Sequence, residues 1–270
     1  MSRPSITVVG SVNLDLVARV EVLPRPGETV TDATFARVKG GKGANQAVAC
    51  ARLGADVTLV CSVGTDVFAD EALPREERLT LAASRVDAPT GVALILVDAS
   101  GENQIAVAPG ANAELKDFEL KPSDAVLAQL EIPDGAVLRA WEQATGFFCL
   151  NAAPARPIEI DADLTVVNRY EHEVLRRRDG IVAVTLGAEG AILLEDGEEI
   201  ARAEPPQVEA IDGTAAGDAF TACLLVAWLE GLEPEAALQR ACAAGALAAS
   251  RFGAQPSLPT AAEIDAILAR

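Results

Sequence analysis

Residues 40–63 read GGKGANQAVACARLGADVTLVCSV and predict a helix joined directly to a strand. Small and apolar residues favour a helix over residues 42–53, and Gly54 favours its end. Residues 57–63 are mostly apolar or β-branched, which is typical of a buried strand. A buried strand next to a helix is the repeating unit of α/β proteins.

The same alternation continues through most of the chain. Residues 6–10 (ITVVG) predict the first strand, and residues 147–150, 164–167 and 181–185 predict three more. Near-continuous apolar strands between helices indicate a mostly parallel sheet that is covered on both faces. We therefore expect an α/β fold, a three-layer α/β/α sandwich, in a single domain over residues 1–270.

Two stretches, residues 16–38 and 91–107, break this pattern. Each reads as strands joined by turns, with residues 24–27 and 100–101 as turn signals. We expect these strands to pair into a small β-sheet lid on the α/β body. Because such a sheet has an open face, we also expect a homodimer that forms through the lid.

The charge balance limits the possible partners. The 270-residue chain carries 40 Asp and Glu against 22 Lys and Arg, a net charge of −18. Nucleic acid is therefore an unfavourable partner, since phosphate backbones are bound mainly by cations. An anionic small molecule would need a local positive field inside this acidic shell.

The remaining composition favours a cytoplasmic protein without a membrane partner. No apolar run approaches the roughly 18 to 20 residues that span a bilayer, and the first residues lead into a strand without a cleavable signal pattern. The cysteines stand singly in apolar segments and His172 is the single histidine, which argues against a zinc cluster. Small buried thiols are favoured, with a redox-sensing thiol as the alternative. The five cysteines are Cys50, Cys61, Cys149, Cys223 and Cys242.

The stretch IDGTAAGDAF (residues 211–220) places Asp218 at the start of an apolar helix. A helix start offers unpaired backbone N–H groups, and the small residues 215–217 would let an anion approach them. Asp218 could then take a proton from a hydroxyl while these amides hold the charge of a transferring phosphoryl group. The alternative is that Asp218 only caps the helix, which would stabilise it by about 1 kcal/mol.

Two further motifs suit a polyhydroxylated ligand. Glycines surround Lys42, and Asn45 lies in the first turn of the helix that follows, although glycine turns before helices are also common without a ligand. In GSVNLDL (residues 10–16), Asn13 and Asp15 stand two apart and share one face of an extended segment. Ligand sites of α/β proteins lie at the ends of such strands.

These three motifs together resemble the ribokinase family of the phosphofructokinase-B-type sugar kinases. The resemblance runs over nearly the whole chain, from GSVNLD through GGKGANQA to GAQPSLP at residues 253–259. It implies that Asp218 is the catalytic base for the sugar hydroxyl that attacks the γ-phosphate of ATP, with Ala216 and Gly217 as anion-hole amides. The implied sugar contacts are Asn13, Asp15, Gly41, Lys42, Asn45, Glu131 and Asp218.

The resemblance also implies positions for the nucleotide and for two cations. The nucleotide positions are Asn168, Thr185, Gly187, Gly190 and Gly217. Glu171 would hold Mg²⁺ through water, since Mg²⁺ prefers oxygen ligands and keeps several waters; alternatively it is a solvated acid on a helix that carries residues 176–178. The positions implied for a monovalent cation, expected to be K⁺, are Asp212, Thr214, Ala248, Arg251, Gly253 and Ser257.

The chain departs from the family pattern at three places. Ala215 replaces a glycine, which is tolerated at negative φ but costs about a kcal/mol or more at positive φ. Residues 67–85 and 172–180 are shorter than the family's usual elements. These shortened segments lie towards the expected nucleotide side and do not include the site residues named above.

The reaction implied by the resemblance is the ATP-dependent phosphorylation of D-ribose at its 5-hydroxyl, with Mg²⁺ and K⁺. A kinase for another pentose, deoxyribose or a nucleoside is the nearer alternative. A sugar-binding or regulatory protein that has lost catalysis is the other. Asp218 and Lys42 argue against the last alternative, because binding alone needs no base beside an anion hole.

Overall fold

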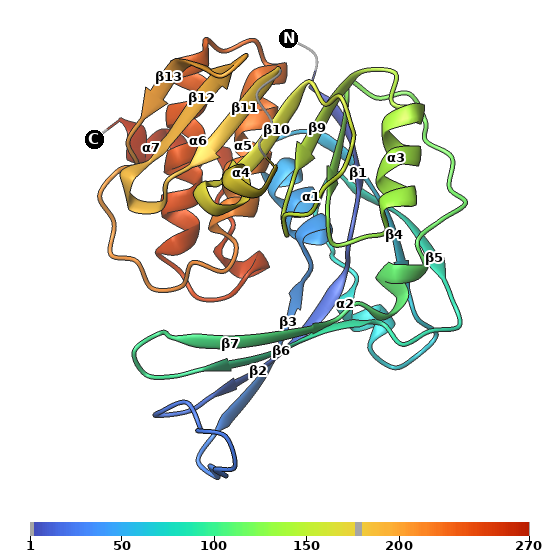
Figure 1. The fold of residues 1–270 in the computed structure, drawn as a ribbon, viewed down its shortest axis with the longest axis vertical. Helices are drawn as coiled ribbons and strands as arrows, with labels where there is room; N and C mark the ends of the chain where they lie inside the picture. Colours follow the sequence, from blue (N-terminus) through green and yellow to red (C-terminus); the bar gives the residue numbers. More distant parts are fainter. Residues whose placement is uncertain (1–2, 176–179, 270) are drawn as a thin grey trace.

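The computed structural model describes residues 3–175 and 180–269 and contains two separate sheets (Figure 1). The large sheet runs, in spatial order, β13 (Glu198–Ala203), β12 (Ala191–Glu195), β11 (Ile181–Thr185), β10 (Leu164–Asn168), β9 (Phe147–Asn151), β8 (Ala125–Gln129), β1 (Ser5–Val9), β4 (Asp56–Val63) and β5 (Leu79–Arg85). All neighbours from β11 to β5 are parallel, and β12 and β13 add an antiparallel edge. The predicted mostly parallel sheet is confirmed.

Helices cover both faces of the large sheet. They are α1 (Lys42–Arg52), α2 (Ala69–Ala72), α3 (Asp134–Gln143), α4 (Arg169–Leu175), α5 (Ala216–Leu229), α6 (Pro234–Ala249) and α7 (Ala261–Leu268), with short 3₁₀ helices η1 (Gly110–Glu114), η2 (Gly187–Glu189) and η3 (Gln255–Ser257). Successive residues of β1 alternate between two cores: Val8 packs with residues of α1, α5 and α6, and Val9 with residues of α3. The predicted three-layer sandwich is therefore confirmed.

Helix α5 is apolar around its whole circumference because it lies in the middle of one layer. It packs against both α1 and α6, and residues 218–227 are all buried. A helix with polar residues on one side could not occupy this place without burying them. The burial of α5 matters for function, since Asp218 enters the interior with it.

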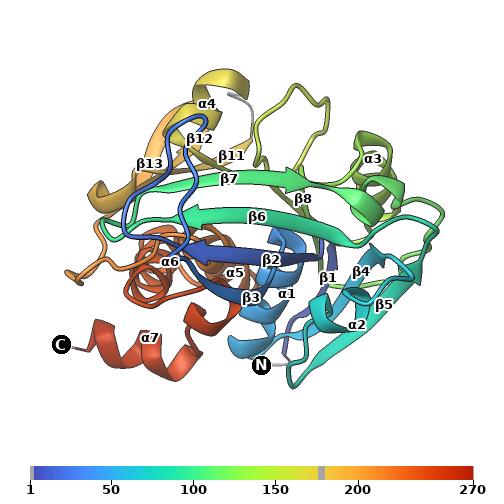
Figure 2. The ribbon, with the colours of Figure 1, turned by 90° about the horizontal axis from the view of Figure 1, so that it is seen from below.

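The small sheet has the strand order β3 (Thr34–Gly40), β2 (Asn13–Arg19), β6 (Gly91–Val97) and β7 (Asn103–Ala108). Its strands come from the two segments in which lid strands are expected. The central pair β2–β6 is parallel, whereas β3 and β7 join antiparallel. Figure 1 shows this sheet projecting beyond one end of the layered body, and Figure 2, seen from that end, shows it lying across the body.

The two segments that are shorter than in the family contain few helices and strands in the described part of the chain. Residues 67–85 contain the four-residue α2 and the edge strand β5. Strand β5 lies at the edge of the sheet farthest from β12 and β13, away from the expected nucleotide positions after β11, so the expectation that this segment lies towards the nucleotide side is wrong. Residues 172–180 contain the end of α4, while residues 176–179, including the arginines at 176–178, lie outside the described part of the chain.

All five cysteines are buried and unpaired, which agrees with the prediction of small buried thiols. Burial raises the pKa of each of them, so their reactive thiolate form is disfavoured. In residues 3–175 and 180–269, no helix combines the length and the apolar character needed to cross a bilayer.

Candidate active site

The predicted site residues gather at the carboxyl ends of the parallel strands. Asp218 is only 4% exposed although it lies in the first turn of α5. Its Oδ2 accepts a hydrogen bond from Asn45 Nδ2 and its Oδ1 one from Gln46 Nε2, both at 2.9 Å. The alternative interpretation of Asp218 as a helix cap is wrong, because Ala215 is the N-cap residue and Asp218 bonds side chains of α1 instead.

Burial raises the pKa of Asp218, because the charged form loses its water. The Lys42 charge and the hydrogen bonds from Asn45 and Gln46 act in the opposite direction, and the Glu131 charge adds to the rise. Asp218 is thus a buried carboxyl group whose ionised form Lys42, Asn45 and Gln46 stabilise, although they do not fully offset the effect of burial.

The backbone before α5 accommodates the alanine that replaces the family glycine. Ala215 has a φ of −113° and is 1% exposed, with its methyl group in the core. The substitution therefore requires no left-handed backbone. The Ala216 amide donates to the Gly213 carbonyl at 3.2 Å, whereas helix geometry leaves the Gly217 amide without an intrahelical partner.

Lys42 begins α1, and the charges of three acidic side chains act on it. Burial acts to lower its pKa, but attraction to Asp218, Glu131 and Glu171 raises it overall. The Lys42 ammonium group is thus held in its charged form. Its backbone amide donates to Glu131 Oε2 at 3.0 Å, and Ser11 Oγ donates to the same oxygen at 2.6 Å.

The turn before Lys42 requires glycine at position 41. Gly41 has a φ of 88°, and a Cβ there would lie 2.8 Å from the Asn13 amide nitrogen and 2.9 Å from the Ser11 carbonyl oxygen. This close approach sets the start of α1 against the segment that carries Asn13.

Asp15 and Asn13 lie at the start of β2 and are both buried. The Asp15 carboxylate covers Gly40, where a Cβ would lie 2.2 Å from Asp15 Oδ2. Burial, and then the charges of Glu131 and Asp218, raise the pKa of Asp15 to about 7. In the folded protein, Asp15 is therefore close enough to Glu131 and Asp218 for their charges to raise its pKa.

Asn112 is a site residue that the sequence analysis missed. Its Nδ2 donates to Asn13 Oδ1 at 2.8 Å and to the Val12 carbonyl at 3.2 Å, and its Oδ1 accepts from the Val12 amide at 2.9 Å. It thereby fixes the side chain of Asn13. No local pattern marks Asn112, because it lies 99 residues from Asn13 along the chain.

Three more buried amides, Gln46, Gln129 and Asn151, were also missed. Gln46 carries a sequence signal, since it is a polar residue inside the apolar part of a predicted helix.

Asn45 has an unsatisfied side-chain oxygen: its Oδ1 is buried without a hydrogen-bond partner in the described part of the chain. A buried, unpaired acceptor next to Asp218 is suited to a ligand hydroxyl.

A mostly apolar cavity of about 590 Å³ joins the end of β11 to the start of α5. Four of the five predicted nucleotide positions line it: Thr185, Gly187, Gly190 and Gly217. Its other walls include Pro205, Pro206, Val208, Phe220, Ala246 and Ala249. Asn168 lies outside this wall, at the end of the neighbouring strand β10.

Asn168 and Glu171 cap the start of α4 reciprocally. The Asn168 amide donates to Glu171 Oε2 at 2.7 Å, and the Glu171 amide donates to Asn168 Oδ1 at 2.8 Å. Glu171 is therefore more than a solvated acid, and its charge also acts on Lys42. The second carboxylate oxygen of Glu171 and the side-chain oxygen of Asn168 are ligand atoms of the kind that Mg²⁺ prefers.

The positions predicted for a monovalent cation lie where the loop before α5 meets the loop after α6. Asp212 Oδ1 accepts from the Thr214 amide at 3.0 Å and from the Thr214 hydroxyl, and Oδ2 accepts from the Gly253 amide at 2.9 Å. Partial burial acts to raise the pKa of Asp212, but these hydrogen bonds lower it overall. Its carboxylate is thus ionised, and its oxygens offer a negative charge that could attract a monovalent cation.

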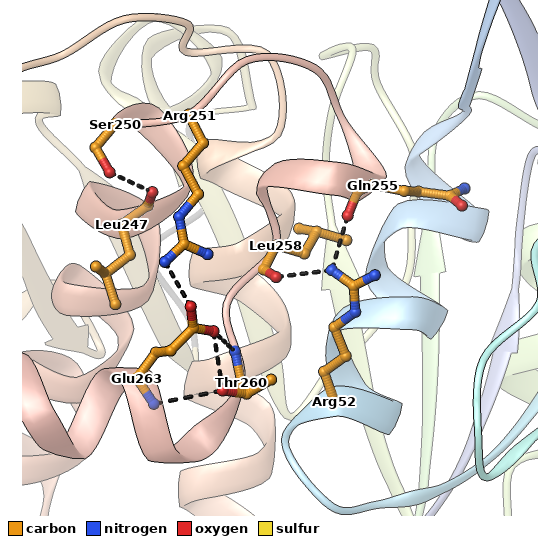
Figure 3. A network of polar contacts seen from close by, with 8 residues as sticks. All are labelled: Arg52, Leu247, Ser250, Arg251, Gln255, Leu258, Thr260 and Glu263. Carbon is orange, nitrogen blue, oxygen red and sulfur yellow. Dashed lines mark hydrogen bonds and ion pairs between the residues drawn. The ribbon is translucent and has the colours of Figure 1, made fainter.

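The other predicted cation positions do not all direct side chains to this point. The Arg251 guanidinium bonds Glu263 at 2.6 Å, and the Ser257 hydroxyl donates to the Ala254 carbonyl at 2.7 Å. The Ala248 carbonyl accepts from the Arg251 amide at 3.1 Å. Figure 3 shows the Arg251–Glu263 pair, and it shows Arg52 donating to two carbonyls around η3, which fixes this loop against α1. Among the described residues, no group of three or more His, Cys, Asp or Glu side chains forms a further metal cluster.

A second cavity, of about 470 Å³, lies between the small sheet and these loops. Asp15, Val17 and Arg19 of β2 line one side, and residues 210–214 and 252–254 line the other. The Arg19 guanidinium stacks over the Phe252 ring at 4.3 Å and links the sheet to the loop. The cavity is therefore lined by Asp15 of the small sheet and by Asp212 of the facing loop.

Comparison with known proteins agrees with this arrangement. The model of the pfkB family of carbohydrate kinases matches residues 3–133 and 138–261. The chain belongs to the pfkB family of carbohydrate kinases. It is a sugar kinase and hence a phosphotransferase.

Several ribokinases are similar to this chain over nearly the full length of both proteins. The ribokinase of Bacillus subtilis is 34% identical over 98% of this chain and 99% of its own. The crystal structure of a ribokinase from Thermotoga maritima is 33% identical, covers 99% of this chain and 100% of that chain, and has a TM-score of 0.84. A structure of Arabidopsis thaliana ribokinase complexed with ribose and ATP is 29% identical with a TM-score of 0.82, covering 99% of each chain. A deoxyribokinase of Salmonella typhi is 30% identical over 94% of this chain and 95% of its own.

Proposed function

We propose that this kinase transfers the γ-phosphoryl group of ATP to the 5-hydroxyl of D-ribose. The observation that carries the proposal is the buried Asp218 carboxylate, held between two amide donors at the start of α5 and facing Lys42. A carboxylate in this place can accept a hydroxyl proton, and the charged groups around it match a transfer between oxygen atoms.

The sugar binds, in this proposal, among the side chains at the start of β2 and α1. Asn13 and Asp15 on β2, Lys42 and Asn45 on α1 and the adjacent Glu131 present acceptors and donors to a chain of hydroxyl groups. The unpaired Asn45 Oδ1 accepts a sugar hydroxyl next to Asp218. A carboxylate such as Asp15 can accept hydrogen bonds from two neighbouring hydroxyls.

The chemical step moves one proton and one phosphoryl group. Asp218 takes the proton of the 5-hydroxyl while this oxygen forms a bond to the γ-phosphorus. The bond between the γ-phosphorus and the β,γ-bridging oxygen breaks, and ADP leaves. Lys42 and the Gly217 amide stabilise the negative charge on the transferring oxygens.

The nucleotide occupies the cavity lined by Thr185, Gly187 and Gly190, whose end at Gly217 meets Asp218. Mg²⁺ would be held through Glu171 and Asn168 and would neutralise phosphate charge. K⁺ would be held by Asp212 and nearby carbonyls and would order the loop before α5. The oxygen atoms of Glu171 and Asn168 fit Mg²⁺, which prefers oxygen ligands.

Two properties of the whole protein belong to the same proposal. A homodimer forms through the small sheet, supported by Phe35 and Leu94, which are 66% and 54% exposed on the same face as Leu16. Light scattering tests the homodimer, with a shift to monomer expected for Leu94→Asp.

The protein is located in the cytoplasm, supported by five cysteines that form no disulfide bonds.

ADP release in the presence and absence of sugar tests the proposed reaction. We expect release to depend on D-ribose and to be stimulated by K⁺. A pocket that bonds a hydroxyl discriminates strongly against an analogue that lacks it, so 2-deoxyribose and a nucleoside are the comparison substrates. Preference for either would assign the related kinase activity instead, and absence of sugar-dependent ADP release would favour a binding protein.

A further inference from the structure

The side chains of Gln46, Gln129 and Asn151 form a buried chain of hydrogen bonds behind Asp218. Gln129 and Asn151 are the last residues of the adjacent strands β8 and β9, where they are paired in register. Gln46 reaches them from α1, and both glutamines are fully buried. The proposed general base is therefore connected to the central sheet by neutral amides.

Gln46 has all its hydrogen-bonding groups engaged. Its Nε2 donates to Asp218 Oδ1 and to Asn151 Oδ1, each at 2.9 Å. Its Oε1 accepts from Gln129 Nε2 at 2.7 Å. An amide nitrogen carries two hydrogens, so both are committed to these two acceptors.

Two fixed acceptors set the direction of this chain. Asn151 Nδ2 donates to the Val166 carbonyl at 3.1 Å, which turns Asn151 Oδ1 towards Gln46. Asp218 Oδ1 is the second acceptor in front of Gln46. If the Gln46 amide were reversed, its oxygen would face two oxygens and its nitrogen would face Gln129 Nε2, so only one orientation is satisfied.

We propose that Gln46 is a positioning residue for phosphoryl transfer, which fixes the orientation of the Asp218 carboxylate and stabilises its ionised form. Asn45 binds Oδ2 of that carboxylate and Gln46 binds Oδ1, so each oxygen carries one amide donor. Gln129 and Asn151 hold Gln46 in turn. This inference rests on the proposed role of Asp218 as the general base.

The amide chain suits a base that must be ionised before it accepts a proton. Burial raises the pKa of Asp218, and the hydrogen bond from Gln46 opposes this rise. Amides do not titrate, so the Gln46 donor is present at every pH of the reaction. The charged groups that face Asp218 are Lys42, Glu131 and Asp15, and a substitution at Gln46 leaves all three in place.

Gln46→Leu tests the proposal through the pH dependence of kcat with D-ribose and ATP. A lost hydrogen bond to a charged group corresponds to about a tenfold effect or more, so we expect kcat to fall about tenfold and the acid limb to move about one pH unit upwards. KM for ribose should change less than about twofold, since Gln46 acts through Asp218. Gln46→Glu places a second carboxyl group against Asp218 and should move the limb further in the same direction.

The matched control is Gln143→Leu on α3. The Gln143 side chain makes two hydrogen bonds, from the Leu120 amide at 2.7 Å and to the Phe118 carbonyl at 3.1 Å, outside the site. Its loss should lower the melting temperature without moving the pH profile. The proposal is overturned if Gln46→Leu lowers the melting temperature as Gln143→Leu does but leaves kcat and the acid limb unchanged.

A second variant keeps the test informative if Gln46→Leu fails to fold. Gln129→Leu removes the donor to Gln46 Oε1 and leaves Gln46 in place, so a smaller upward shift of the acid limb is expected. An unshifted limb in a folded Gln129→Leu protein would overturn the proposal. Turnover retained by Asp218→Asn would refute the base role of Asp218, and absence of ribose-dependent ADP release in the native protein would refute the proposed function. Both outcomes are distinguishable from an unshifted pH profile in the Gln46 and Gln129 variants.

Discussion

The replacement Asp218→Asn removes one ionisable group from the site and changes little else in volume. In the native protein each carboxylate oxygen accepts one amide N–H, from Asn45 Nδ2 and from Gln46 Nε2. An asparagine can accept only one of these, because its own amide nitrogen would face the other donor. The variant therefore keeps the shape of the site but loses the base and one hydrogen bond.

The expected loss of kcat is about 10²- to 10⁴-fold, the range for removal of a general base, or about 2.7 to 5.5 kcal/mol in the activation free energy. Ribose should still bind, since the other sugar contacts remain. The folded state should not lose stability from the change in charge: burial raises the pKa of Asp218 above its unfolded value, so the ionised carboxylate costs stability at neutral pH.

A coupled assay for ADP release measures kcat, and calorimetry measures ribose binding. Asp163→Asn is the matched control, since the Asp163 carboxylate accepts from the Phe148 amide at 2.7 Å near the opposite end of the parallel strands. Near-native kcat in Asp218→Asn, with ribose binding intact, would refute the reasoning. Equal losses in both variants would also refute it, because they would indicate a general effect of the lost charge.

Four further outcomes follow from the structure. Because the pKa of Asp15 is raised to about 7, kcat/KM for ribose should fall as the pH drops through 7, and Asp15→Asn should abolish this limb; an unchanged limb would contradict the assignment. The same raised pKa means that the folded protein loses stability as the pH rises from 3.8 to about 7, because Asp15 ionises more readily in the unfolded chain. Asp15→Asn should therefore raise the free energy of unfolding at pH 8 by up to about 4 kcal/mol, measured by urea denaturation. Gly41→Ala should be destabilised in urea by more than Gly27→Ala, because both have positive φ but only position 41 places a Cβ within 3 Å of backbone atoms; equal losses would exclude the clash. Asp212→Ala should lose the difference in ADP release between KCl and NaCl, and retained K⁺ stimulation would exclude Asp212 as a ligand.

Much of the fold could be predicted because its signals are local. The helix over residues 42–53 and the strands at 6–10 and 57–63 were evident from periodicity and glycine placement, and the structure has α1, β1 and β4 there. The antiparallel β12–β13 edge was not predicted. The order of strands in the sheet also depends on crossover connections that no single segment encodes.

Only part of the candidate site could be predicted from the sequence. Its motifs and Asp218 are visible in the sequence, but the backbone at Ala215 and the capping role of Glu171 required coordinates. The negative φ at Ala215 and the burial of its methyl group in the core are properties of the packed backbone, which the local sequence does not report.

The sequence by itself thus determined several of the helices and strands, the small residues at the start of α5 and the acid that follows them, because helix and strand preferences act over a few neighbouring residues. Only the tertiary structure decided which amides meet that acid. Gln46 lies 172 residues from Asp218 and 83 from Gln129 along the chain. The physical reason is that the direction of each hydrogen bond in this group follows from fixed acceptors on other elements, the Val166 carbonyl and the buried carboxylate, which only chain packing brings together.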